Sequence, residues 1–132
     1  MRLTDSPNGH EISGSGLALT LRDFGRFSQF VLDNGVIDRK SIVPDGWFAE
    51  ATSPKVLKGG GKLDYGYLWW IGKTEQSRAD KAFYAAGIFG QNIYIDPKEH
   101  VVVVQNSAEP KPFGMETIVP EVFYNAVVNT LK

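Results

Sequence analysis

The stretch Ala82–Pro97, AFYAAGIFGQNIYIDP, decides the fold of this chain. It holds two short strand-like runs, Phe83–Ala86 and Asn92–Asp96, separated by a Gly-Ile-Phe-Gly step. The two glycines of that step permit positive φ angles or a close approach of the backbone to another group. The backbone N–H groups of Ile88 and Phe89 can therefore face an oxygen atom, as in an oxyanion site. The same spacing also fits a β-bulge or a barrel-corner kink without chemistry.

Length and composition predict one globular domain. The chain has 132 residues, which is enough to bury a core, and we treat 1–132 as a single domain. Apolar residues make up 42% of the chain and charged residues 22%, as in ordinary soluble proteins. The formal net charge of -1 argues against nucleic acid or an anionic membrane as a partner.

Residue types also bear on metals and membranes. The sequence has no cysteine and two histidines, His10 and His100, which lie far apart. We therefore expect no metal site and no cofactor, with each histidine facing solvent in a loop. No apolar run reaches the length of a membrane span, so the sequence predicts a soluble chain whose compartment is unknown.

A helix is predicted to begin at Thr20, after an irregular segment over residues 1–16. The Thr20 side chain can cap free backbone N–H groups, and Asp23 completes a capping box three residues later. Asn34 and Gly35 are typical of a helix end. Apolar residues recur at helical spacing and form one face that another element must cover. This face consists of Leu21, Phe24, Phe27, Phe30 and Val31.

The middle of the chain predicts a second short helix, a loop and a buried strand. Pro44 suits the first turn of the helix, and Pro54 stops it. Three glycines make Lys58–Lys62 a flexible loop, which we interpret as a connector rather than a lid. Tyr65–Ile71 predicts a strand buried on both sides, and Lys73–Lys81 predicts an exposed charged turn. The inner stripe of the helix consists of Trp47, Phe48 and Ala51.

The second half of the chain predicts an α+β fold with at least three antiparallel strands. These are Tyr65–Ile71, Phe83–Asp96 with a break near its glycines, and Val101–Asn106. The last run shows no polar alternation, which indicates a central strand. The segment Thr117–Leu131 predicts a helix packed across the sheet. Its inner face is expected to consist of Val119, Val122, Phe123, Ala126 and Thr130.

Five segments, from about Leu3 onward, occur in a recognisable order. They are GSGLALTLRDFGRFSQFVLDNG, a Pro-initiated helix with a tryptophan, YGYLWW, AAGIFGQNIYIDP and HVVVVQNSA. This order resembles the carboxyl-terminal part of the serine β-lactamase-like family, with its β-lactamase/transpeptidase-like fold. That family includes penicillin-binding proteins, class C β-lactamases, esterases and 6-aminohexanoate dimer hydrolase. The Gly-Ile-Phe-Gly-Gln step is most similar to the last of these.

The resemblance implies roles for the residues around the glycine step. Family members use a serine in an S-x-x-K motif, a tyrosine in a Y-x-N motif and a bordering K-T-G strand. Ala85-Ala86-Gly87 stands where that strand has K-T-G, so the Ile88 N–H is implied as one oxyanion donor. The missing lysine puts recognition of a substrate carboxylate in doubt. The implied substrate-binding residues are Tyr84, Ala86, Gly87, Phe89, Gly90 and Gln91.

Other interpretations remain for two of these side chains. Tyr84, between Phe83 and Ala85, also fits a strand-packing residue. Gln91 also fits ordinary exposed strand polarity.

The nucleophile motifs of the family are missing from this sequence. No serine has lysine three residues later, and no tyrosine has asparagine two residues later. We therefore expect a carboxyl-terminal piece of an amide or ester hydrolase that is inactive alone, and a bacterial cytoplasm or periplasm is implied. Its partner is expected to be a second copy, forming a homodimer, or the missing amino-terminal segment. The alternative is a non-catalytic self-association or protein-binding module on the same scaffold.

Overall fold

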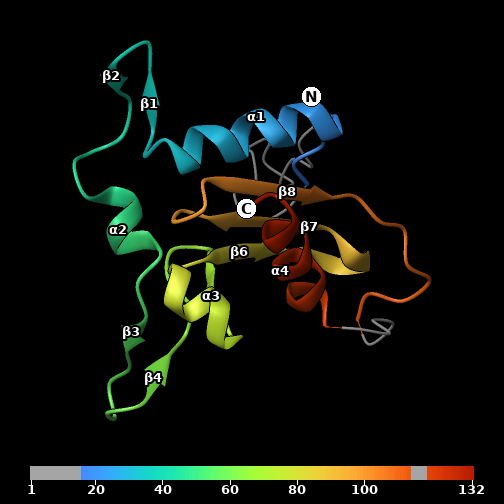
Figure 1. The fold of residues 1–132 in the computed structure, drawn as a ribbon. Helices are drawn as coiled ribbons and strands as arrows, with labels where there is room; N and C mark the ends of the chain where they lie inside the picture. The colour runs from blue at the N-terminus through green and yellow to red at the C-terminus, as the bar shows by residue number, and fades with distance from the viewer. Residues whose placement is uncertain (1–15, 114–118) are drawn as a thin grey trace, which may run out of the picture.

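The computed structural model describes residues 16–113 and 119–132, and in these the chain forms a four-stranded sheet with helices packed on it (Figure 1). The strand order is β5-β6-β7-β8, and each neighbouring pair is antiparallel. The predicted α+β fold with an antiparallel sheet is confirmed. The strands are β5 Trp70–Ile71, β6 Phe83–Ala86, β7 Asn92–Asp96 and β8 Val101–Gln105.

The glycine step is the connection of a β-hairpin. Strand β6 pairs with β7 along its whole length, and the turn between them contains a short 3-10 segment, η1, at Ile88–Gly90. Phe89 has φ 61° and Gly90 has φ 81°, and these two left-handed residues reverse the chain. The two strand-like runs Phe83–Ala86 and Asn92–Asp96 are therefore confirmed as β6 and β7, whereas their prediction as one strand with a bulge or kink is wrong.

The segment Tyr65–Ile71 is not a continuous strand. Only its last two residues lie in the sheet, because the chain turns tightly before them. Leu68 has φ 67°, and the Gly66 N–H donates a hydrogen bond to the Trp69 carbonyl at 2.8 Å. Trp69 is buried and Trp70 is 37% exposed. The burial that the apolar run predicts is confirmed at Trp69, whereas the strand that it predicts is wrong for the residues before Trp69.

Helix α1 spans Leu21–Leu32, as the capping pattern predicts. The Thr20 hydroxyl accepts from the Asp23 N–H at 3.2 Å and donates to the Asp23 carboxylate at 2.7 Å. Asn34 and Gly35, both with positive φ, follow its end. The predicted apolar face is only partly covered, because Val31 is buried whereas Leu21 and Phe27 are exposed.

Two small hairpins and a short helix connect α1 to the sheet. Strands β1 Val36–Ile37 and β2 Lys40–Ser41 form one hairpin, and β3 Lys55–Val56 and β4 Lys62–Leu63 form the other. Both extend away from the sheet (Figure 1). The triple-glycine loop joins β3 to β4, which agrees with its interpretation as a connector. Helix α2, Trp47–Ala51, lies between the hairpins.

The predicted start of the second helix is too early. Pro44 lies in the turn before α2, where its carbonyl accepts from the Trp47 N–H at 3.1 Å. Gly46 then precedes the helix with φ 75°. Of the predicted inner stripe, Ala51 is buried, Phe48 packs against the core and Trp47 is 43% exposed.

The segment Lys73–Lys81 is a helix and not an exposed turn. Helix α3 spans Glu75–Asp80, and the Thr74 side chain accepts from the Ser77 N–H at its start. Ser77 and Asp80 are buried. The prediction is wrong because a charged segment can still bury one side, as Ser77 and Asp80 do here.

Each face of the sheet is covered by one long helix, with α1 on one face and α4, Pro120–Thr130, on the other (Figure 1). Strand β8 is the edge strand of the described sheet, which corrects its prediction as a central strand. Helices cover both faces of the sheet, which explains why β8 directs valine side chains to both of them. The row toward α1 contains Ile71, Phe83, Ile95 and Val102, and the row toward α4 contains Trp70, Tyr84, Tyr94 and Val103.

Helix α4 packs on the sheet, but with a different face from the predicted one. Residues 117 and 118 of the predicted helix lie outside the described residues. The buried residues are Glu121, Tyr124, Asn125 and Val128. The predicted inner residues Val119, Val122 and Phe123 are 61%, 56% and 49% exposed. The prediction failed because apolar residues lie on two sides of this helix and polar partners select the buried side.

Two other expectations concern histidines and membranes. His10 and nearly all of the predicted irregular segment 1–16 lie outside the described residues. The His100 side chain is exposed, 3.9 Å from the Asp33 carboxylate. None of the described helices combines the length and the apolar character that crossing a membrane requires.

Candidate functional site

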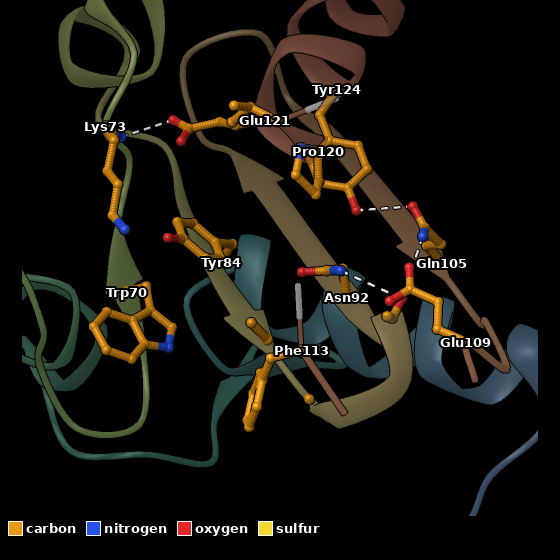
Figure 2. Close-up of a pocket in the computed structure, with 14 residues that line it drawn as sticks. Trp70, Lys73, Tyr84, Asn92, Gln105, Glu109, Phe113, Pro120, Glu121 and Tyr124 are labelled. Atoms are coloured by element: carbon orange, nitrogen blue, oxygen red, sulfur yellow. Dashed lines mark hydrogen bonds between the residues drawn. The ribbon is translucent and has the colours of Figure 1, made fainter. Parts of the chain in front are cut away.

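A pocket of about 340 Å³ lies on the α4 side of the sheet, where the β6–β7 hairpin turns (Figure 2). The sheet contributes Trp70, Tyr84, Ala86, Asn92 and Gln105. The loop after β8 and the start of α4 form the opposite wall, with Glu109, Phe113, Val119, Pro120, Glu121 and Tyr124.

The predicted site residues divide between the pocket and its border. The structure brings together in the pocket lining Tyr84, Ala86, Gly87 and Gly90. It leaves outside the lining Ile88, Phe89 and Gln91. All seven nevertheless belong to one hairpin, so those outside the lining lie next in sequence to those within it.

The backbone N–H groups of the turn are used in different ways. The Gly87 N–H donates to the Gln91 carbonyl at 2.8 Å, and the Phe89 N–H donates to the Pro112 carbonyl at 3.1 Å. Within residues 16–113 and 119–132, the Ile88 N–H has no hydrogen-bond acceptor. An oxyanion donor must be free in this way before its ligand arrives. Ile88 is therefore the better donor of the two that the sequence suggested.

The Gln91 side chain forms its hydrogen bonds with the loop after β8 and does not line the pocket. Its side-chain amide donates to the Ser107 carbonyl and accepts from the Ser107 N–H at 3.3 Å. The Glu109 N–H donates to the Phe89 carbonyl at 3.2 Å, which adds a second link between the same two segments. The turn is thus held by the loop after β8.

Tyr84 lies between the pocket and the core. Its side chain lines the pocket, and it also packs beside the buried aromatic residues Tyr94 and Tyr124. Trp70 lies opposite Tyr84 in the strand register and forms the next part of the wall.

Several pocket residues were not foreseen from the sequence. The Lys73 ammonium lies 5.8 Å from the centre of the Trp70 ring. The Glu121 carboxylate accepts from the backbone N–H groups of Lys73 and Thr74, at 2.8 and 3.1 Å, and so joins α4 to the start of α3. Glu109 lies on a loop with no periodic pattern. Among these residues, only Glu121 stands in a recognisable sequence pattern, because it follows Pro120 in a first helical turn. That pattern predicts an interaction with the start of its own helix and not with the start of α3.

A buried polar network supports the pocket from behind. The Tyr94 hydroxyl donates to the Asn125 side-chain oxygen at 2.9 Å and lies 3.1 Å from the Ser77 hydroxyl. Burial raises the pKa of Tyr94 to about 12 and that of Tyr124 to about 12. Tyr124 donates to the Gln105 side chain at 3.0 Å. Both phenols therefore stay protonated donors at neutral pH.

Comparison with known proteins gives two informative matches. No protein-family model matches the chain. Over 124 residues it is 28% identical to the 6-aminohexanoate-dimer hydrolase of Paenarthrobacter ureafaciens. This match covers 83% of this chain and 29% of the hydrolase. A solved structure, "Putative 6-aminohexanoate-dimer hydrolase from Bacillus anthracis", matches with a TM-score of 0.78 and 29% identity. That match covers 96% of this chain and 32% of the other.

The predicted resemblance is confirmed. The chain is similar in sequence and in fold to 6-aminohexanoate-dimer hydrolases, and the similarity extends over nearly all of it. It spans 29% of the length of the curated relative and 32% of the solved chain.

Proposed function

We propose that this chain supplies one wall and one oxyanion donor of an acyl-transfer site in a serine hydrolase that cleaves amides or esters. The observation that carries the proposal is the Ile88 N–H, which has no acceptor among residues 16–113 and 119–132 and lies at the turn of a hairpin that borders a pocket, in a chain similar to a 6-aminohexanoate-dimer hydrolase. In this role the Ile88 N–H stabilises the negative oxygen that develops when the nucleophile attacks a carbonyl.

The remaining parts of the reaction come from outside this sequence. The nucleophile and its base, in an S-x-x-K arrangement, are supplied by another segment, and the nucleophile's own N–H is the second oxyanion donor. Tyr84, Ala86 and Gly87 form the wall along which the acyl group lies. Without a Ser-Lys pair the chain alone forms no acyl-enzyme. It is therefore expected to leave nitrocefin, nitrophenyl esters and amide dimers intact.

The donor role is tested by nuclear magnetic resonance on the isotopically labelled chain. Titration with the linear dimer of 6-aminohexanoate is expected to shift the amide resonances of Gly87 and Ile88. Ile88→Pro removes the N–H and suits the 3-10 conformation there, and the extended Gly87 (φ -104°, ψ 165°) tolerates a following proline. Ile88→Ala keeps the N–H and is the matched control.

The expected result is that Ile88→Pro weakens binding of the dimer whereas Ile88→Ala does not. Equal binding by wild type and Ile88→Pro would contradict the donor role. Stoichiometric labelling of any serine in this chain by a fluorophosphonate would contradict its inactivity.

A second candidate function is self-association through α4. The observation that favours it is the outward face of this helix, where Val122 and Phe123 are 56% and 49% exposed. Large apolar groups gathered on one face are unusual for a monomer. A second copy that covers this face would form a homodimer.

A further inference from the structure

The Gln105 side chain connects helix α4 to the turn that carries the Ile88 N–H. Gln105 ends strand β8 and contributes to the pocket wall. Its Nε2 atom donates to the Gly90 carbonyl at 3.2 Å, and its Oε1 atom accepts from the Tyr124 hydroxyl at 3.0 Å. Figure 2 shows the second of these bonds, between α4 and β8. One side chain therefore joins a helix, a strand and the turn of the β6–β7 hairpin.

The donors and acceptors of this link fit together in only one way. A backbone carbonyl can only accept, so the Gly90 oxygen requires the amide nitrogen of Gln105. The amide oxygen then faces Tyr124, whose hydroxyl must donate. Burial raises the pKa of Tyr124 to about 12, so this proton is present at neutral pH. Tyr124 thereby fixes which end of the Gln105 amide faces the turn.

The Gln105 bond differs from other bonds that hold the turn. The Phe89 N–H donates to the Pro112 carbonyl at 3.1 Å, so it ties the turn to the loop after β8. The Asn92 side chain donates to the Gly90 carbonyl at 3.4 Å, but it lies only two residues away in the same hairpin. A bond within the hairpin cannot fix where the hairpin lies. Gln105 instead ties the Gly90 carbonyl to a neighbouring strand and to α4.

We propose that Gln105 is a positioning residue for the oxyanion site, because it holds the turn in the orientation in which the Ile88 N–H meets a developing negative oxygen. In this role Gln105 touches no reacting atom and acts through Gly90. Donors that stabilise a transition state must be fixed before the reaction, and bonds from a strand and a helix fix them more closely than bonds from a loop. The inference rests on the proposed function in one respect, namely that Ile88 is the donor.

The test compares amide hydrogen exchange and amide resonances of the 132-residue chain without ligand. Gln105→Met keeps the length of the side chain and removes both hydrogen bonds. The Phe89 N–H is expected to exchange about fivefold faster, as the loss of one net hydrogen bond from the turn implies, and the Ile88 amide resonance is expected to move. Gln76→Met is the matched control, because it removes the amide pair with Asn129 that joins α3 to α4. This control is expected to leave the exchange of Phe89 and the resonance of Ile88 unchanged.

Two further variants separate positioning from simple packing. Tyr124→Phe keeps the ring and removes the donor that orients the amide, so it is expected to move the Ile88 resonance in the same direction by a smaller amount. Gln105→Glu keeps the acceptor for Tyr124 but, as a carboxylate at pH 7, loses the donor to Gly90. It is expected to speed the exchange of Phe89 as Gln105→Met does, whereas a packing role alone predicts wild-type exchange. Gln105→Glu also replaces Gln105→Met in the test if the latter does not fold.

Wild-type exchange at Phe89 in both Gln105 variants, or an equal acceleration in Gln76→Met, would overturn the inference. The proposed function fails on a different measurement, the shift of the Ile88 amide when the linear dimer of 6-aminohexanoate is added. If Gln105→Met loosens the turn but the dimer leaves the wild-type Ile88 amide unshifted, the hold of Gln105 on the turn stands and the oxyanion role falls. If the dimer shifts Ile88 and binds Gln105→Met as tightly as wild type, the oxyanion role stands and the positioning role falls.

Discussion

The two faces of the sheet are built on different chemistry. The face toward α1 is closed mainly by apolar side chains, with Val31, Trp69, Phe83 and Ile95 packed together, and the buried Ser28 hydroxyl of α1 donates within its own helix to the Phe24 carbonyl. The face toward α4 is closed by aromatic rings that carry hydroxyl groups and by the polar side chains that bind them. The pocket lies on the second face.

This difference separates stability from site geometry. Apolar packing gains free energy from every group removed from water and places few constraints on direction. Hydrogen-bonded groups gain less net energy but fix positions, because a buried donor or acceptor without its partner is costly. The α1 face is therefore expected to contribute more to the free energy of unfolding, and the α4 face more to the geometry of the pocket.

The largest expected effect on the free energy of unfolding comes from truncating a large side chain in the core on the α1 face. Phe83 is 5% exposed, and its ring meets that of Trp69 edge to face at 5.1 Å. Phe83→Ala is expected to lower the free energy of unfolding by about 3–5 kcal/mol, through lost burial and the cavity left behind. Urea titration followed by tryptophan fluorescence measures the change.

The control for this substitution is Phe113→Ala. Phe113 is 72% exposed, so its loss is expected to change the free energy of unfolding by less than about 0.5 kcal/mol. If Phe83→Ala prevents folding, Phe83→Leu provides a milder variant that should still be less stable than wild type. Equal costs at Phe83 and Phe113 would contradict the assignment of the main apolar core to the α1 face.

The same contrast explains what the sequence could predict of the fold. Helix α1 was predicted closely because Thr20, Asp23 and Gly35 act on their own helix, within a few residues in sequence. The buried face of α4 was not predicted from the sequence, because partners far away in the chain, such as Ser77 and Tyr94, select it. The strand prediction for Tyr65–Ile71 failed for a related reason, since the tight turn found there contains the same apolar residue types as a strand.

The site was predictable only as far as local backbone geometry reaches. The glycine step identified the turn at Ile88, because positive φ angles demand particular residues. The loop that holds this turn, with Ser107 and Glu109, carries no pattern of its own. Its importance arises from tertiary contacts with Phe89 and Gly90.

A smaller effect is expected from the hydroxyl of Tyr94 on the α4 face. Tyr94→Phe removes the hydrogen bonds of the hydroxyl with Asn125 and Ser77, while Asn125 still accepts from the Ser77 hydroxyl at 3.1 Å. The free energy of unfolding is expected to fall by about 1 kcal/mol at pH 7. Thermal unfolding at neutral pH, followed by circular dichroism, measures this change.

The pH dependence gives this prediction a second measurement. Burial raises the pKa of Tyr94 to about 12, above the usual value of 10.0, so the folded state holds the proton more tightly. Stability is therefore fully present below pH 10 and is lost as the pH rises toward 12. Tyr94→Phe is expected to lose stability less steeply over this range, and a slope equal to that of wild type would contradict a buried phenol. Tyr65→Phe is the control.

The smallest expected effect on folding, and the one that tests self-association, lies on the outer side of α4. Val122 and Phe123 are 56% and 49% exposed, so replacing both with serine is expected to change the free energy of unfolding of one chain by less than about 0.5 kcal/mol. If a second copy covers this face, each side chain contributes about 1 kcal/mol to association on each copy, and the double variant dissociates the dimer. Light scattering at micromolar concentration distinguishes the two cases. Val56→Ser, at a 78% exposed valine of the β3–β4 hairpin, is the matched control and is expected to leave the dimer intact. A wild-type chain that scatters as a monomer would refute association through α4, and loss of the dimer in Val56→Ser alone would place the interface on the extended hairpin instead.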